Sequence, residues 1–303
     1  MDNLNKDNSC WQYLKKIEYL NQDIIKANLT EDEISSIEIK ELKFQYIDKN
    51  DKIKCQEIKT FIEKYEWLKK MVNRPTHRFI AIYKNKIIAV QVFGTPYAFS
   101  KLLGPENQDK EKLIARGASI SWAPTNTGSW LLMNSINWMI KNTNYRFFTC
   151  YADTEANELG TIYQACNFIY LGKNAGGKVE YFDPKCPEKG WFSDRIFRRV
   201  GTYKRFAQKL GYSWDKSWNT KWTMHWDRVP FLIHAEIQRA VNEWRNSCEK
   251  REIPRKHKYV FIKGQSKTET KKLLNRFYEI NPQLRPKGPN LRGGLSYPKN
   301  RGK

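Results

Sequence analysis

The sequence predicts an α/β protein built on a mixed β-sheet that is flanked by helices. Short apolar runs rich in β-branched and aromatic residues alternate with segments of helical periodicity between residues 37 and 172. Two of these runs adjoin across the polar turn KNK, as in a hairpin. Another run passes through a polar turn directly into a helical segment, which is the arrangement that places ligand-binding loops at strand ends.

The elements follow in the order strand, helix, two strands, strand, helix, strand, helix, strand. The first half predicts a strand over 37–47, a helix over 55–71, a hairpin over 77–94, a strand over 117–124 and a helix over 129–142. The second half predicts a strand over 145–153, a short helix over 160–167 and a strand over 168–172. Further helices are expected over 10–26 and 231–250, and a strand after the basic turn at 254.

Changes in composition divide the chain into four parts. Residues 1–36 form a polar N-terminal arm, and 37–187 form the catalytic core. Residues 188–264 are dense in Arg, Lys and Trp, as expected of a nucleic-acid-binding extension. Residues 265–303 carry Pro, Gly and positive charge without periodicity, so we expect a disordered tail.

The net charge of the sequence and its distribution predict what kind of molecule the protein binds. Lys and Arg total 54 against 32 acidic residues, which gives a net charge of +22 that favours binding to phosphate backbones. The excess lies mainly after residue 195 and is interleaved with aromatic residues, so double-stranded DNA is the expected partner. A basic surface that serves solubility, or the codon bias of an AT-rich genome, is the alternative explanation.

The cysteines and the apolar runs predict the cellular compartment of the protein. Six cysteines show no CxxC pair and no histidine at zinc-ligand spacing, so we expect a reduced cytoplasmic protein without a metal site. Neither a signal sequence nor an 18-residue apolar stretch is present, so no membrane association is expected.

The turn SWAPTNTGSW precedes the helix over 129–142. Backbone N–H groups at such a helix start bind phosphate, with Gly128 allowing close approach and Ser129 capping the helix. The turn resembles the pyrophosphate loop of GNAT-superfamily acyltransferases, although the second glycine and the leading Arg or Gln are absent. The ordinary alternative is a capped helix without a ligand.

A more specific resemblance lies in YADTEANELGTIYQACNFIYLG, which is similar to the signature of bacteriophage Mom-type proteins. The similarity extends loosely upstream to FIEKYEWL and downstream to PRKHKYVFI, with Thr154 and Phe168 where the family usually has Pro and Trp. This resemblance implies a GNAT-like fold and a transferase that converts adenine in DNA to a carbamoylmethylated form. That modification shields phage DNA from restriction in the host cytoplasm, and the donor would be acetyl-CoA or a related acyl donor.

The resemblance assigns Asp153, Tyr163 and Arg116 to catalysis, and Asn126 and Ser129, with Gly128, to the cofactor. Asp153 would hold or deprotonate the adenine amine, and its alternative role is to cap the following helix. Tyr163 would protonate a leaving thiolate, and otherwise packs as an aromatic. Arg116 would pair with Asp153, a phosphate or the donor, and otherwise is a solvated charge.

The remaining candidates concern the DNA. An adenine in a duplex hides its amine, so the base must be flipped out, and aromatic side chains such as Trp214, Trp218, Trp222 and Trp226 would stack on it. The candidates for contact with substrate or DNA are Tyr65, Glu66, His77, Arg198, Arg199, Lys256 and Lys258. Two other functions are open: an N-acetyltransferase acting on a protein or small amine, and a GNAT-shaped nucleic-acid-binding protein without catalysis.

Overall fold

The computed structural model describes residues 10–96, 99–176, 178–286 and 293–299. It forms two compact units, one comprising residues 1–175 with 256–303 and the other residues 176–255. The second unit is thus an insertion in the sequence of the first. This division corrects the expected boundaries at 187 and 264, because the chain re-enters the first unit at residue 256.

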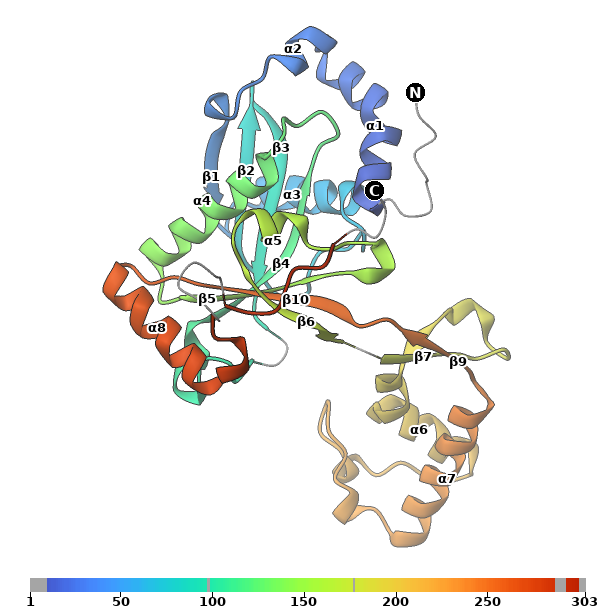
Figure 1. Cartoon of the computed structure of the whole chain (residues 1–303). Coiled ribbons are helices and arrows are strands. Elements are labelled where there is room, and N and C mark those ends of the chain that lie inside the picture. The colour runs from blue at the N-terminus through green and yellow to red at the C-terminus, as the bar shows by residue number, and fades with distance from the viewer. Residues whose placement is uncertain (1–9, 97–98, 177, 287–292, 300–303) are drawn as a thin grey trace. The chain divides into compact units, whose positions relative to one another are not determined.

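The first unit is built on a seven-stranded mixed sheet in the order β1-β2-β3-β4-β5-β10-β6 (Figure 1). Only β4 and β5 run parallel, and the other neighbours are antiparallel. The strands are β1 Lys43–Ile47, β2 Pro75–Tyr83, β3 Lys86–Gly94, β4 Glu111–Ser119, β5 Phe147–Ala152, β6 Ile169–Ala175 and β10 Lys256–Ile262. Its helices are α1 Trp11–Ala27, α2 Glu31–Ser35, α3 Lys52–Tyr65, α4 Thr127–Asn142, α5 Thr161–Ala165 and α8 Lys267–Ile280.

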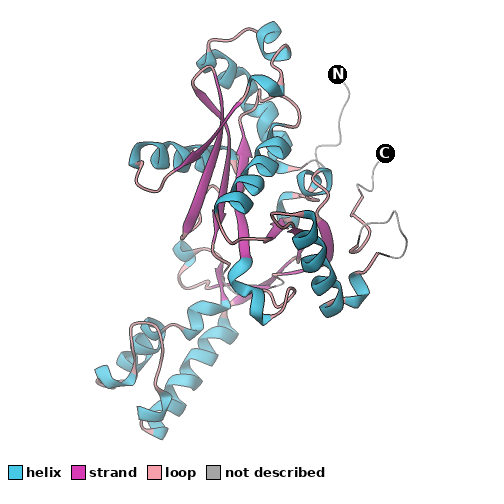
Figure 2. Cartoon of the chain, turned by 90° about the vertical axis from the view of Figure 1, so that its left-hand side faces the viewer, coloured by secondary structure: helices cyan, strands magenta, loops and turns pink. Residues whose placement is uncertain are grey.

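Helices cover both faces of this sheet (Figure 2). Side chains alternate along β2, so Phe79 and Ala81 pack in the core beneath α4, whereas Ile80 packs in a second core with Ile58 and Ile62 of α3. The mixed α/β class expected from the sequence is confirmed.

Strands β4 and β5 pair over only three residues. The hydrogen-bonded ladder joins Glu111–Leu113 to Phe147–Thr149 and ends at Leu113. A bulge follows at once, because the register between β3 and β4 shifts between Val92 and Phe93. The carboxyl-terminal half of β4 and the end of β5 are therefore not hydrogen-bonded to each other, and both lead into the loops that carry the candidate site.

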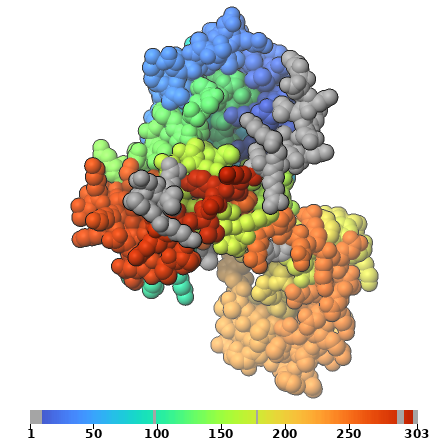
Figure 3. Space-filling view, in the orientation of Figure 1, coloured from blue at the N-terminus to red at the C-terminus, as the bar shows by residue number. Residues whose placement is uncertain are grey.

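The segment expected to be a disordered tail contains a helix. Leu273 and Phe277 of α8 pack against Val260 and Ile262 of β10, and Ser266 caps the helix by accepting from the Glu269 N–H at 3.1 Å. Residues 293–299 lie against β6, where the Leu295 N–H donates to the Tyr170 carbonyl at 2.9 Å (Figure 3). Residues 287–292 and 300–303 of the expected tail lie outside the described residues.

The second unit has a small sheet in the order β8-β7-β9 and two helices. Its elements are β7 Lys178–Phe182, β8 Phe192–Ser193, α6 Val200–Lys209, α7 Phe231–Ser247 and β9 Glu249–Ile253. Trp214 and Trp226 pack against its core and Trp218 is buried, whereas Trp222 is 80% exposed. Within the described residues of both units, no helix is long and apolar enough to span a bilayer.

Candidate active site

Asp153 follows the last residue of β5 and its carboxylate is buried. One oxygen accepts from the Glu155 N–H at 3.1 Å and so caps the 3₁₀ turn Thr154–Ala156. The other oxygen forms an ion pair with Lys256, the first residue of β10. Asp153 therefore has both the expected capping role and a charged partner. That partner is Lys256, which the sequence had suggested for phosphate contact.

Glu158 lies five residues further along the same loop, and its Oε2 accepts from the Asp153 N–H at 3.2 Å. The pKa of Glu158 is raised to about 7, chiefly by burial and also by the nearby carboxylates of Glu66 and Asp153, while the Asp153 N–H and Lys256 oppose the rise. A carboxyl group with this pKa exchanges its proton near neutral pH. The sequence offered little sign of Glu158, because its neighbours come from distant segments.

Arg116, on β4, is paired with Glu66 and not with Asp153. The Arg116 Nε lies 3.7 Å from Glu66 Oε2, and the guanidinium also donates to the carbonyls of Lys70 at 2.8 Å and Ala115 at 2.6 Å. Burial raises the pKa of Glu66, whereas Arg116 and Lys256 lower it. Glu66 is buried and Arg116 is partly buried. Because the charges of Asp153 and Lys256 also act on Glu66, this pair belongs to one charged cluster with Asp153, Glu158 and Lys256.

Tyr163 lies on α5, with its ring between Phe168 and Tyr259 at centroid distances of 5.4 and 5.5 Å. Burial raises the pKa of Tyr163 well above its usual range, and the charges of Cys150, Glu158 and Glu66 add to this effect. Tyr163 is therefore protonated throughout the neutral range, as a proton donor would be.

Tyr259 of β10 holds the loop that precedes α5. Its hydroxyl donates to the Leu159 carbonyl, which also accepts from Gln164 Nε2 at 2.8 Å. The next residue, Gly160, has φ of 70°, and a Cβ there would lie 2.6 Å from a ring carbon of Tyr259. Only glycine fits this approach, so β10 contributes both Lys256 and the support of this loop.

The turn before α4 contains the expected cofactor residues. Asn126 adopts φ of 68° at the helix start, and Ser129 donates its hydroxyl to the Asn126 carbonyl at 3.0 Å. The expected capping role of Ser129 is therefore wrong, because no side chain caps this helix. A Cβ on Gly128 would lie 3.0 Å from Ile162 Cδ1, so the glycine lets α4 and α5 approach closely.

The N-terminal segment, whose role the sequence left unassigned, adjoins the cluster through α1. Gln12 donates to the carbonyl of Gly117, on β4, at 3.4 Å. The buried Asp23 accepts from Tyr65 at 2.8 Å, from Lys64 at 2.5 Å and from Ser121 at 2.8 Å. Tyr65 thus ties α1 to α3, and its hydroxyl is engaged by Asp23.

His77 lies on β2, apart from the charged cluster. Its ring is 6.2 Å from Tyr46, 6.1 Å from Trp138 and 6.0 Å from Tyr145. Burial, and then the charges of Lys112 and Arg78, lower the pKa of His77 to about 4. It is a neutral member of an aromatic group.

The remaining basic candidates are dispersed. Arg198 and Arg199 are exposed on the second unit, with Arg198 paired to Asp194 at 2.6 Å. Lys258 is partly buried on β10, which lowers its pKa, and its Nζ lies 5.9 Å from the ring centroid of Tyr151. Across the described ranges, no group of three or more His, Cys, Asp or Glu side chains is arranged to hold a metal ion.

Three carboxyl groups and two cations thus converge where β5 ends. Glu66, Asp153 and Glu158 share the site with Arg116 and Lys256, as their mutual effects on pKa show. Burial raises the pKa values of both Glu66 and Glu158, and that of Glu158 reaches about 7, so its carboxyl group is present in both protonation states near neutral pH. The arrangement can accept a proton at Glu158 and donate one from Tyr163.

Several solved acyltransferases are similar in structure to the chain. One is a GNAT family acetyltransferase from Elizabethkingia anophelis with acetyl-CoA bound, at 11% identity and a TM-score of 0.36, covering 74% of this chain and 99% of that one. An acetyltransferase from Bacillus subtilis in complex with CoA has 10% identity and a TM-score of 0.33, with coverages of 73% and 99%. An acyl-CoA N-acyltransferase from Pseudomonas aeruginosa has 13% identity and a TM-score of 0.30, with coverages of 43% and 88%. No curated protein matches the chain.

The Mom protein family matches residues 21–186. This range contains Glu66, Arg116, Asp153, Glu158 and Tyr163, whereas Lys256 lies beyond it. Because the match spans more than half of the 303 residues, the chain belongs to the Mom protein family.

Proposed function

We propose that this protein is a transferase that modifies the exocyclic amine of adenine in DNA with an acyl-derived group. The observation that carries the proposal is the partly buried cluster of Asp153, Glu158 and Lys256 at the end of β5. Membership of the Mom family directs this chemistry to DNA adenine, as the resemblance of its signature implied.

The adenine amine needs a group that accepts its proton, because its lone pair is delocalised into the ring. Asp153 is already paired with Lys256 and serves to fix the loop. Glu158, with a pKa of about 7, matches the requirement for a base that works at neutral pH. We therefore assign proton acceptance to Glu158, positioning to Asp153, and proton donation to the leaving group to Tyr163.

An acyl-CoA donor fits the backbone near α4. Helix geometry leaves the N–H groups of Gly128 and Ser129 without intrahelical acceptors, as pyrophosphate binding requires, whereas the Thr127 N–H donates to the Pro124 carbonyl at 3.2 Å. Gly128 adds no side chain there, and β4 is not paired with β5 beyond Leu113. Such a donor supplies an activated acyl carbon. The side chain of Asn126 is also part of this proposed contact.

Charge supports DNA as the acceptor. Residues 256–303 contain 13 Lys and Arg against two acidic residues, so they carry +11 of the net +22. Within the second unit, Arg199 is exposed and has no carboxylate within 4.0 Å among the described residues. Electrostatic attraction to the phosphate backbone follows from this distribution.

The test is mass analysis of nucleosides from plasmid DNA co-expressed with the protein. The wild type should yield a modified adenine, and Glu158→Gln should reduce it at least about 100-fold, the usual scale for losing a positioned base. Glu155→Gln is the matched control, because Glu155 is exposed on the same loop. Unmodified adenine with the wild type, together with acetylation of an amine substrate, would instead establish an N-acetyltransferase.

A further inference from the structure

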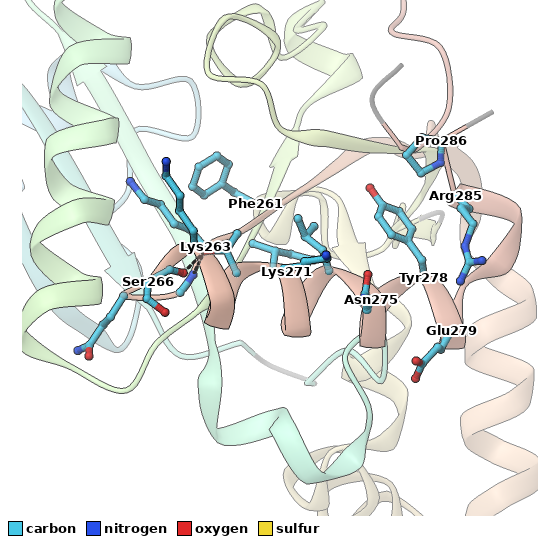
Figure 4. Close-up of a pocket in the computed structure, with 15 residues that line it drawn as sticks. Phe261, Lys263, Ser266, Lys271, Asn275, Tyr278, Glu279, Arg285 and Pro286 are labelled. Carbon is cyan, nitrogen blue, oxygen red and sulfur yellow. Dashed lines mark hydrogen bonds between the residues drawn. The ribbon is translucent and has the colours of Figure 1, made fainter. Parts of the chain in front are cut away.

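An open groove of about 1170 Å³ runs along the end of β10 and the length of α8, away from the charged cluster (Figure 4). A second hollow of about 460 Å³ shares Lys263, Gly264 and Gln265 with it and reaches Lys141 near the end of α4. Both hollows belong to the first unit. None of the residues assigned above to catalysis lines either of them, so the groove requires its own explanation.

Positive charge dominates this groove. Its lining includes Lys263, Lys267, Lys271 and Arg285, and within the described part of the chain none of these has a carboxylate within 4.0 Å. Lys263 donates instead to Asn137 Oδ1 at 2.8 Å. The one acidic side chain of the lining, Glu279, lies 3.5 Å from Arg276, so it is already compensated.

Aromatic and apolar side chains lie among these cations. Phe261, Leu274 and Tyr278 line the groove and are each half-buried (Figure 4). Exposed cations alone are sufficient to contact the phosphates of a duplex. Cations combined with a recessed aromatic surface are the features that bind a single strand, with phosphates on the cations and bases stacked on the rings.

The dimensions fit a strand that continues from the candidate active site. β10 begins at Lys256 in the charged cluster and ends at Ile262 beside the groove, and seven residues of strand span about 20 Å. The 14 residues of α8 span a further length of about 20 Å. Each of these lengths is sufficient for several nucleotides of a single strand.

We propose that the groove between β10 and α8 binds a single strand of DNA several nucleotides away from the adenine being modified. The identity of the strand as DNA, and its path to the charged cluster, rest on the function proposed above. The inference that the groove binds single-stranded nucleic acid does not depend on that function. It is drawn only from the aromatic surface and the cations Lys263, Lys267, Lys271 and Arg285.

The experiment measures the anisotropy of a fluorescein-labelled 20-nucleotide oligothymidylate and of a 20-base-pair duplex. Lys267→Glu/Lys271→Glu should weaken binding to the single strand at least about tenfold, and lower the slope of log affinity against log salt by about 1.4, for two phosphate contacts. The matched control is Lys43→Glu/Lys49→Glu, which makes the same charge change at exposed positions on and beside β1. It should alter single-strand affinity less than about threefold. Circular dichroism melting curves establish that both variants fold.

Equal losses in both variants would show a general charge effect and overturn the groove. So would a loss confined to the duplex. If the wild type produces no modified adenine while Lys267→Glu/Lys271→Glu still loses single-strand binding, the groove stands and the enzymatic proposal fails. If this variant instead modifies adenine fully and binds the single strand as the wild type does, the enzymatic proposal stands and the groove proposal fails.

Discussion

Lys256 forms an ion pair with Asp153 across a separation of 103 positions in the sequence. The Asp153 side chain is 8% exposed and that of Lys256 is 29% exposed, so neither charge is well solvated alone. Breaking the pair by Asp153→Ala should lower the free energy of unfolding by about 1–3 kcal/mol, because a partly buried ammonium loses its partner and the 3₁₀ turn loses its cap. Urea unfolding measures this effect.

The double variant Asp153→Ala/Lys256→Met supplies the control. It removes both charges, so it should be more stable than the sum of the two single variants indicates. Strict additivity would contradict a direct interaction. Adenine modification should fall in all three variants, since the loop that carries Glu158 is no longer fixed.

Glu158 makes stability depend on pH in a defined direction. Its ordinary pKa is 4.5 and its folded-state pKa is about 7, so between these values the folded protein holds a proton that the unfolded chain has lost. The free energy of unfolding should therefore fall as pH rises from about 4.5 to about 7, by at most about 3 kcal/mol, and stay level above that range.

The difference between wild type and Glu158→Gln in urea unfolding, measured from pH 4.5 to 8, isolates this contribution. Glu155→Gln should show the wild-type dependence. A Glu158→Gln variant whose stability tracks the wild type at every pH would rule out a buried, protonated Glu158.

Gly160 should tolerate no side chain. Gly160→Ala places a Cβ 2.6 Å from a Tyr259 ring carbon at φ of 70°, and should cost at least about 2 kcal/mol beyond the left-handed strain of about 1–2 kcal/mol. Gly172→Ala is the control, with φ of 98° and its nearest atom 3.1 Å away on Leu295. Thermal melts should place Gly160→Ala well below Gly172→Ala, and equal melting temperatures would show that the Tyr259 contact has no energetic weight.

Tyr163→Phe should separate chemistry from packing. Loss of the hydroxyl leaves the ring and its aromatic contacts in place and should cost at most about 1 kcal/mol, while adenine modification falls about 100-fold. The control Tyr170→Phe also removes a tyrosine hydroxyl from the first unit, one that is hydrogen-bonded to His257 Nδ1 at 2.6 Å, and should leave modification unchanged. If both variants modify DNA like the wild type, Tyr163 is a packing residue.

Local patterns in the sequence were sufficient to predict most of the helices and strands of the first unit. The alternation in β2 and β3 and the helical spacing of α3 and α4 predicted each element, because each buries one face against a neighbour. The helix α8 was also visible in principle, since Ser266 and Glu269 have cap spacing and Leu273 and Phe277 share a face. Positive charge on the exposed face of that helix obscured this pattern.

The site was only partly predictable. Asp153 and Tyr163 belong to one signature segment and Arg116 to β4, so local sequence could propose them, and their catalytic roles stay predictions. The burial of Glu158 and the pairing of Lys256 depend on a strand that returns after an insertion of 80 residues. Nothing local to either residue encodes such a long-range contact.

The position of β10 has a consequence for how the protein is made. The strand lies between β5 and β6, yet both of those neighbours are translated before the entire inserted unit, and β10 only after it. During synthesis the nascent sheet therefore has a vacancy in its interior until residue 262 has left the ribosome, and Asp153 meanwhile lacks its cation. Enzymatic competence should arise abruptly, late in translation, once a single strand has been inserted.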